Sequence, residues 1–504
     1  MTADDRPDIL LITIDQWRGD GLSCDGHPNA CTPNIDALAA QGVRFARHYA
    51  QAAPCGPSRA SLLTGTYLHT HRSVGNGTPL DSNRTNLALE VAAAGYAPTL
   101  FGYTDTTVDP RAVTDPDDPR LRTYEGILPG FEVEVNLPED VEAWGAWLRG
   151  HGIDAPAGAV TDTMYRRSDP GPDDPGWGPT PYPAEYSEAA FLVERFGQWL
   201  DRQDTDEPLF AHVTFLRPHP PYLAPAPWHA LVDPAAVKIG VRHESVEAEG
   251  AQHPMVAGAL LVDQARSPED DHELRCLIAT YWGMLAEVDH QLGRLLDQLD
   301  RTGRAERTIV VLTADHGEQL GDHRLLEKLG YFDSSYHIPM VVAGPIVAPE
   351  AVGRVVEEFT ENIDIMPTLL SALGRPRPAQ CQGADLGPFL LGTVPESWRD
   401  AVHWEWDFRD PLATKVLGIS LQSSNLAVIR DRHRKYVHFA GLPPAFYDLD
   451  EDPGELYNLA DDPSRAAEIL HYAQRMLSWR MSSDDDTLAS IRIGAPGMVD
   501  LRSV

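Results

Sequence analysis

Paired cysteines are missing from this chain. Its 504 residues contain only five cysteines, an odd number with no CxxC pair: Cys24, Cys31, Cys55, Cys276 and Cys381. A disulfide framework and a thiolate zinc site of the CxxC type are therefore excluded as organising features. Most of these cysteines are expected to be small buried hydrophobic side chains. One of them, Cys55, lies in a motif with its own chemistry.

Positive charge is also scarce. The chain has 41 basic against 75 acidic residues, which gives a formal net charge of −34. Such a field repels nucleic acid and anionic membrane surfaces, so we expect neither as a partner. If the substrate is a small anion, a local cationic pocket must overcome this general repulsion.

Long apolar runs are absent as well. No segment approaches the roughly 18 apolar residues that span a bilayer, and residues 1–7 hold no apolar core of a signal peptide. We therefore expect a cytoplasmic protein that is not inserted in a membrane. Hydrophobic residues nevertheless make up 42% of the chain, which is enough for a large buried core.

Three short apolar runs indicate buried parallel strands. Asp8–Ile14, Leu209–Phe215 and Thr308–Thr313 are continuous rather than alternating, as in strands covered on both faces. Polar residues follow each run, and ligands of open α/β sheets bind at the carboxyl ends of strands. Helical patterns lie between the runs, at residues 34–40, 87–94, 185–201 and 273–301. The sequence thus predicts an α/β fold with a large, mainly parallel sheet sandwiched by helices.

The chain is predicted to have three parts. Residues 1–375 form the catalytic α/β domain, and residues 376–480 form a smaller C-terminal subdomain with an antiparallel sheet. Residues 481–504 have little capacity to form a core, and we expect a frayed tail or an arm that packs on a neighbouring subunit.

Loops and small elements complete this picture. Two stretches, 105–158 and 168–183, are typical of long loops that shape the mouth of an active site. In the smaller subdomain, strands are expected at 427–429 and 435–439, and one helix near 465–479.

The segment from Cys55 to Gly65 carries the strongest chemical signal. It reads Cys-Gly-Pro-Ser-Arg-Ala-Ser-Leu-Leu-Thr-Gly, and we expect a helix that begins near Ser58 and stops at Gly65. Cys55 would then lie just before a helix N-terminus, where free N–H groups and the helix dipole favour an anionic nucleophile. Arg59, one turn into the helix, would point back to the same place.

This segment matches the sulfatase signature C-x-P-S-R-x-x-L-x-x-G at every fixed position, so the chain resembles the sulfatase family of the alkaline phosphatase superfamily. The resemblance implies that Cys55 is oxidised to formylglycine by a formylglycine-generating enzyme. It also implies one divalent metal ion, Mn²⁺ or Ca²⁺, for which oxygen and imidazole ligands are suitable. The implied ligands are Asp15, Gln16, Cys55, Asp315 and His316.

The first two implied ligands, Asp15 and Gln16, indicate a resemblance to a smaller group within the family. Most sulfatases have two consecutive aspartates there, whereas Asp15-Gln16 opens a run Asp-Gln-Trp-Arg-Gly-Asp that resembles bacterial phosphonate monoester hydrolases, which also cleave phosphate diesters. The likeness extends along almost the whole chain, including residues 217–221, 315–323 and 404–410. It implies a homo-oligomer assembled through the C-terminal arm. The implied substrate contacts are Asn76, Tyr103, His219 and Lys328.

One position departs from this likeness. Close relatives read Gly-Tyr-Thr-Thr-Thr-Thr where this chain has Gly102 to Thr107, with Asp105 replacing a threonine expected near the substrate. An ionised Asp105 would repel a second substrate charge or attract a cationic leaving arm, or the side chain would turn into solvent. This departure keeps a sulfate monoester open as the substrate.

The family mechanism assigns the catalytic roles. The oxidised, hydrated side chain of Cys55 attacks phosphorus or sulfur and forms a covalent ester, and Arg59 stabilises its alkoxide. Lys328 and Asn76 offset charge on the non-bridging oxygens, and His219 protonates or stabilises the leaving oxygen. We predict a hydrolase of small anionic esters that cleaves phosphonate monoesters and phosphate diesters. An arylsulfatase on the same site is the alternative, and an inactive anion-binding protein with an unmodified thiol is a third hypothesis.

Overall fold

The structure is a computed structural model that describes residues 6–138, 140–169, 176–204, 207–409, 415–495 and 497–501. The expected loop at 168–183, the run 404–410 and the tail at 481–504 therefore fall partly outside the described residues, as does the polar N-terminal segment 1–7.

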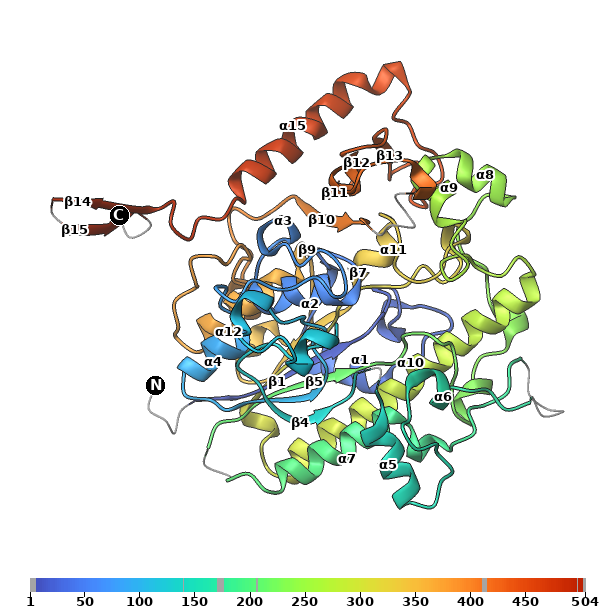
Figure 1. Ribbon diagram of the computed structural model, residues 1–504, viewed down its shortest axis with the longest axis vertical. Coiled ribbons are helices and arrows are strands. Elements are labelled where there is room, and N and C mark those ends of the chain that lie inside the picture. Colours follow the sequence, from blue (N-terminus) through green and yellow to red (C-terminus); the bar gives the residue numbers. More distant parts are fainter. Residues whose placement is uncertain are drawn as a thin grey trace.

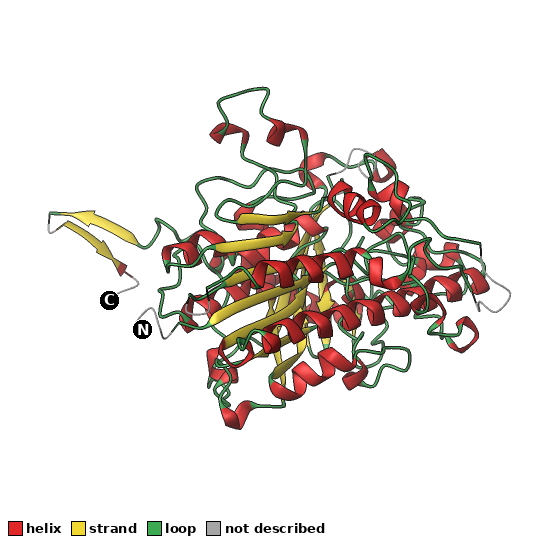
Figure 2. Cartoon of the chain, turned by 90° about the horizontal axis from the view of Figure 1, so that it is seen from below, coloured by secondary structure: helices red, strands yellow, loops and turns green. Residues whose placement is uncertain are grey.

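A nine-stranded sheet of described residues forms the centre of the molecule, with helices on either side of it (Figure 2). The strand order is β4-β3-β5-β1-β6-β8-β2-β7, and β9 pairs with β2. The strands are β1 (Asp8–Ile14), β2 (Val43–Tyr49), β3 (Pro98–Gly102), β4 (Glu132–Asn136), β5 (Phe210–Phe215), β6 (Thr308–Ala314), β7 (His337–Ile338), β8 (Met340–Ala343) and β9 (Arg354–Glu361).

The three predicted strands lie side by side in the middle of this sheet. Strand β1 pairs in parallel with β5 on one side and with β6 on the other. Strands β3, β4 and β9 also join parallel partners, whereas β7 and β8 run antiparallel to theirs. The predicted mainly parallel sheet is thus confirmed. Because β1, β5 and β6 are parallel neighbours, the residues that follow them meet at one edge.

Alternate residues of β1 contact two separate helix layers. Leu10, Ile12 and Ile14 belong to one apolar cluster, which includes residues of α1, α7 and α10. Ile9 and Leu11 belong to a second cluster, which includes residues of α2, α4 and α12. Burial on both faces explains why the sequence of this strand is continuously apolar.

The helices have the following bounds: α1 (Pro33–Gln41), α2 (Cys55–Thr64), α3 (Leu68–His71), α4 (Leu87–Ala93), α5 (Glu142–Gly150), α6 (Thr161–Met164), α7 (Glu188–Leu200), α8 (Val246–Ala251), α9 (Pro254–Ala259), α10 (Asp271–Arg301), α11 (Asp333–Tyr336), α12 (Ile365–Ala372), α13 (Gly387–Leu390) and α15 (Ala466–Ser482).

Helix α2 begins earlier than the sequence predicts. Its first residue is Cys55, with Pro54 as the N-cap, so Cys55 lies inside the first turn and not before the helix. Pro57 is compatible with this start because the first N–H groups of a helix have no partner within it, so the missing N–H costs nothing there. The helix ends at a left-handed Gly65, as expected.

The expected loop at 105–158 also contains regular structure. Strand β4 lies at one edge of the sheet, beside β3, and its sequence, Glu-Val-Glu-Val-Asn, is mostly exposed. Helix α5 follows it and buries Trp144 and Leu148. A five-residue edge strand and a nine-residue helix give weak signals in sequence, because each is too short for its pattern to repeat.

The smaller antiparallel sheet is confirmed. Its strands are β10 (Ala401–Asp407), β11 (Asn425–Asp431), β12 (Arg434–Phe439) and β13 (Ala445–Asp448), in that order. Helix α15 packs against it through Tyr472 and Met476. The fully buried Lys435 of β12 donates from Nζ to Asp333 at 3.0 Å, and so joins the small sheet to α11, the helix that precedes β7. The domain boundaries themselves stay a prediction.

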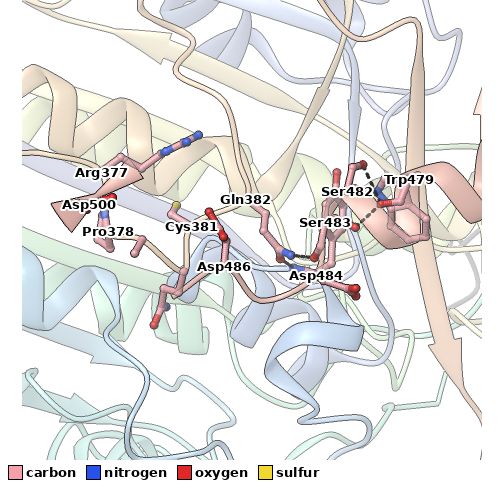
Figure 3. Close-up of a pocket in the computed structure, with 13 residues that line it drawn as sticks. Arg377, Pro378, Cys381, Gln382, Trp479, Ser482, Ser483, Asp484, Asp486 and Asp500 are labelled. Carbon is pink, nitrogen blue, oxygen red and sulfur yellow. Dashed lines mark hydrogen bonds between the residues drawn. The ribbon is translucent and has the colours of Figure 1, made fainter. Parts of the chain in front are cut away.

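The C-terminal segment leaves the body as an arm (Figure 1). It ends in a hairpin of β14 (Ile491–Gly494) and β15 (Gly497–Asp500). Ile493 and Met498 are 83% and 73% exposed there, and they have no apolar partner in the core clusters of the described chain. A cavity of about 610 Å³ lies at the base of this arm and is lined by residues such as Arg377, Gln382 and Asp486 (Figure 3). Packing of the arm on a neighbouring subunit stays a prediction.

The described helices include none that is long and apolar enough to cross a membrane.

Candidate active site

Four predicted site residues converge at the carboxyl edge of β1 and β6. The potential ligand atoms of Asp15, Cys55, Asp315 and His316 all lie within 4.8 Å of one another, and all four residues are buried. Asp15 follows β1, and Asp315 and His316 follow β6. Because Ile14 pairs with Ala314 across these parallel strands, the residues after them are brought together. Cys55 comes from the first turn of α2.

The acceptor atoms of this group point to a common centre. His316 donates from Nδ1 to the carbonyl of Gly317 at 3.1 Å, so its Nε2 keeps a lone pair. That Nε2 lies 3.2 Å from the sulfur of Cys55 and 3.6 Å from Oδ1 of Asp15. Burial lowers the pKa of His316, which favours the neutral imidazole that a metal ligand requires. Two carboxylates and a neutral imidazole fit a divalent cation.

Arg59 holds the two carboxylates in place. Its Nε donates to Oδ2 of Asp315 at 3.0 Å, and its Nη2 donates to Oδ2 of Asp15 at 3.3 Å. Oδ1 of Asp315 meanwhile accepts the backbone N–H groups of Gln16 and His316, at 3.1 and 2.8 Å. Burial raises the pKa of Asp15, but nearby cationic groups, among them Arg59, hold it below its ordinary range. Asp15 is therefore ionised, and both carboxylates are held in a fixed orientation.

Tyr103, the residue after β3, supports the same contacts. Its hydroxyl donates to Oδ2 of Asp15 at 2.5 Å and accepts from Nη2 of Arg59 at 3.1 Å. Its ring lies 4.2 Å from the guanidinium carbon of Arg59, within the range of a cation–π contact. Burial raises the pKa of the Tyr103 hydroxyl well above its usual value, so the proton donor is retained.

Gln16 lies beside this group with a left-handed backbone (φ 65°). Its Oε1 accepts from Nζ of Lys328 at 2.9 Å, and its Nε2 donates to Oε2 of Glu318. The amide is thus oriented by a donor on one side and an acceptor on the other.

Glu318 is a site residue that sequence reasoning missed. Its buried carboxylate also accepts from the hydroxyl of Tyr222 at 2.9 Å and from the backbone N–H groups of Leu320 and Glu327, both at 2.7 Å. Its place two residues after His316 was visible in the sequence. A glutamate that follows a glycine nevertheless has the appearance of a loop residue.

Lys328 and His219 form a hydrogen-bonded pair. Nζ of Lys328 lies 3.0 Å from Nε2 of His219, whose Nδ1 donates to the carbonyl of Pro220 at 2.8 Å. Burial and the charge of Lys328 lower the pKa of His219 to about 4. Burial lowers the pKa of Lys328, but negatively charged neighbours, among them Glu327 and Asp15, outweigh this effect and raise it. At neutral pH the shared proton is therefore on Lys328, and His219 accepts it.

Asn76 and Asp105 flank the start of α2. Oδ1 of Asn76 accepts the backbone N–H of Gly56 at 2.9 Å. A Cβ atom at Gly56 would lie 3.0 Å from this Oδ1 and 3.0 Å from the carbonyl oxygen of Asp105, so a larger residue there would require these neighbours to shift. Asp105 is 7% exposed and has φ 49°. The expected alternative, an Asp105 side chain turned into solvent, is therefore wrong.

Cys55 is a weak nucleophile in its unmodified form. Burial raises the pKa of the thiol well above its usual value, and the neighbouring Asp15 raises it further. The unmodified side chain is neutral at physiological pH, and a neutral thiol is a poor nucleophile.

Comparison with known proteins agrees with this geometry. The family model described as Sulfatase matches residues 7–375, and the model described as N-sulphoglucosamine sulphohydrolase, C-terminal, matches residues 321–482. The chain belongs to the sulfatase family, whose members are hydrolases.

Its relatives are as follows. The multifunctional alkaline phosphatase superfamily protein PehA of Trinickia caryophylli is 40% identical over 98% of this chain and 99% of its own. The crystal structure of the phosphonate monoester hydrolase of Agrobacterium radiobacter is 45% identical, with a TM-score of 0.92 over 98% of this chain and 99% of that one. An arylsulfatase of Clostridium perfringens is 27% identical over 94% of each chain.

Proposed function

We propose that this protein hydrolyses phosphonate monoesters and phosphate diesters at the site built around Cys55. The observation that carries the proposal is the buried group of Asp15, Cys55, Asp315 and His316, with the neutral Gln16 beside it. The similarity to a phosphonate monoester hydrolase, at 45% identity over nearly the whole chain, favours phosphorus esters. The arylsulfatase relative is more distant, at 27% identity.

The proposal includes a formylglycine derived from Cys55 and one divalent cation, Mn²⁺ or Ca²⁺. Asp15, Asp315 and His316, with Gln16 and the modified Cys55, would hold the cation. The bound cation would supply a positive charge that lowers the pKa of a hydroxyl and polarises the ester. A formylglycine-generating enzyme in the host is then a required partner during maturation.

The chain's own residues orient the reacting groups. Arg59 holds the two carboxylates by hydrogen bonds and lies one turn along the helix from Cys55, where it stabilises negative charge on the modified side chain. Lys328 carries the proton of its pair with His219 and can hydrogen-bond a non-bridging or leaving oxygen. Nε2 of His219 holds a lone pair in this arrangement, so it can donate to a leaving oxygen only after it has taken the proton from Lys328.

The test compares three esters that have the same leaving group. Protein with confirmed Cys55 modification is assayed for kcat/KM on an aryl phosphonate monoester, an aryl phosphate diester and an aryl sulfate. We expect kcat/KM for the two phosphorus monoanions to exceed that for the aryl sulfate by about 100-fold or more, which corresponds to a difference of about 2.7 kcal/mol in transition-state stabilisation. If the sulfate is the best substrate, the arylsulfatase alternative replaces this proposal. If an unmodified Cys55 is found in protein from the native host, both are wrong and the anion-binding hypothesis remains.

A further inference from the structure

Asp105 differs from the other buried charged groups of the site in its hydrogen bonding. Asp15, Asp315, Arg59 and Lys328 each have at least one hydrogen-bonding partner of opposite charge or complementary polarity. The carboxylate of Asp105 accepts no hydrogen bond from any residue that the structure describes, although the residue is only 7% exposed.

Hydrogen bonds on both sides hold the backbone at Asp105. The N–H of Thr106 and the hydroxyl of Thr104 both donate to the carbonyl of Gly126, each at 3.0 Å. The two flanking residues are thus bound to the same carbonyl, and Asp105 between them has a left-handed φ of 49°. A non-glycine residue in this conformation is uncommon and is maintained only when its surroundings require it.

The charged groups that face Asp105 come from four separate segments. They are Arg59 of α2, Asp15 after β1, Asp315 after β6, and Lys328. Among these protein groups the two cations equal the two other aspartates in number, so Asp105 makes the site more negative by one charge, whether or not the proposed divalent cation is bound. A buried carboxylate without a partner costs free energy, and an active site is where such a cost is retained for a function.

We propose that Asp105 is a specificity-determining residue that excludes doubly charged esters from the site and so restricts it to singly charged substrates. Phosphonate monoesters, phosphate diesters and sulfate monoesters carry one negative charge, whereas phosphate monoesters carry two near neutral pH. The carboxylate adds a like charge that acts on Cys55, in a largely buried site where charges are screened less than in bulk water. This inference rests on the proposed function, because it names the substrate charge that the same site accepts.

Two ligand pairs isolate charge from shape. The first pair is an aryl phosphate and an aryl sulfate with the same leaving group, which are both tetrahedral at the central atom but differ by one charge. The second pair, phenylphosphonate and benzenesulfonate, differs in the same way and is not hydrolysed. Burial raises the pKa of Asp105 to about 7, while Arg59 opposes this effect, so measurements at about pH 8.5 keep Asp105 ionised and the phosphorus monoesters doubly charged.

Two neutral variants separate the charge of Asp105 from its size. Asp105→Asn has the same shape, and Asp105→Ser is smaller; neither is β-branched, so both tolerate the left-handed backbone better than threonine would. In each variant, the ratio of kcat/KM for aryl phosphate to that for aryl sulfate is expected to rise by about tenfold to a hundredfold. The ratio of affinities for phenylphosphonate and benzenesulfonate, measured by calorimetry, should rise in the same direction.

The outcomes are distinct. A ratio that changes by less than about threefold in both variants overturns the inference, and so does a rise in only one variant, because shape would then be the cause. For a variant that binds ligands but has no activity, the ratio of affinities measured by calorimetry is judged by the same criterion. If the wild-type protein hydrolyses neither phosphonate monoesters nor phosphate diesters, the proposed function fails. The binding comparison then still tests Asp105 independently.

Discussion

The hydroxyl of Tyr103 offers a one-atom test of how the site is organised. It donates to Oδ2 of Asp15 at 2.5 Å, and the acceptor is a buried, ionised carboxylate. A hydrogen bond to a charged group contributes about 1.5–3 kcal/mol. Tyr103→Phe removes this bond but keeps the ring over Arg59. If the loss is expressed in catalysis, kcat/KM should fall by about 10- to 150-fold, mainly through kcat, because Asp15 is no longer held in position.

The assay uses wild type and variant at equal Cys55 modification and equal metal content. Tyr447→Phe is the matched control, since it also deletes a buried hydroxyl, one that lies 2.8 Å from the hydroxyl of Tyr331 in the small sheet. The control should lose stability while keeping kcat/KM within about twofold of wild type. A Tyr103→Phe variant as active as this control would refute the reasoning, because Asp15 would then be held without the tyrosine.

Two further predictions concern a nucleophile and a buried histidine. Cys55→Ala should abolish turnover without changing the thermal midpoint by more than a few degrees, and near-normal kcat in this variant would rule out Cys55 as the nucleophile. His71 hydrogen-bonds Ser61 of α2 at 2.9 Å, and burial lowers its pKa to about 3, so its neutral form stabilises the fold above about pH 6.5 and this contribution is lost as pH falls. We expect the unfolding free energy, measured by urea denaturation, to decrease between pH 7.5 and pH 5 by about 2 kcal/mol less in His71→Gln than in wild type. An equal decrease in the two proteins would contradict this prediction.

The strand-end residues of the site could be predicted because the physics that places them is local. A continuous apolar run such as Asp8–Ile14 marks a strand buried on both faces, and parallel neighbours align their carboxyl ends. Asp15 and Asp315 follow such runs, so their proximity could be expected without knowledge of any side-chain packing. The signature around Cys55 added the third segment. The structure brings all of these residues together.

The partners of these residues could not be predicted in the same way. Lys328 and Gln16 are separated by 312 positions, and Glu318 and Gln16 by 302. No periodicity relates residues so far apart, and only the folded sheet brings them into contact. The same holds for Asp105, whose missing partner is a property of its surroundings and not of its sequence neighbours.

The general charge of the chain and the local charge of the site act in opposite directions. A net charge of −34 repels anions at long range, but salt at physiological strength screens exposed charges beyond about 8 Å. Arg59 and Lys328 are nearly fully buried, so they are screened far less and act on the substrate at short range. The attraction therefore begins only inside the site, where Asp105 reduces it by one charge. A site with this balance holds a singly charged ester at the nucleophile and gains little from a second charge.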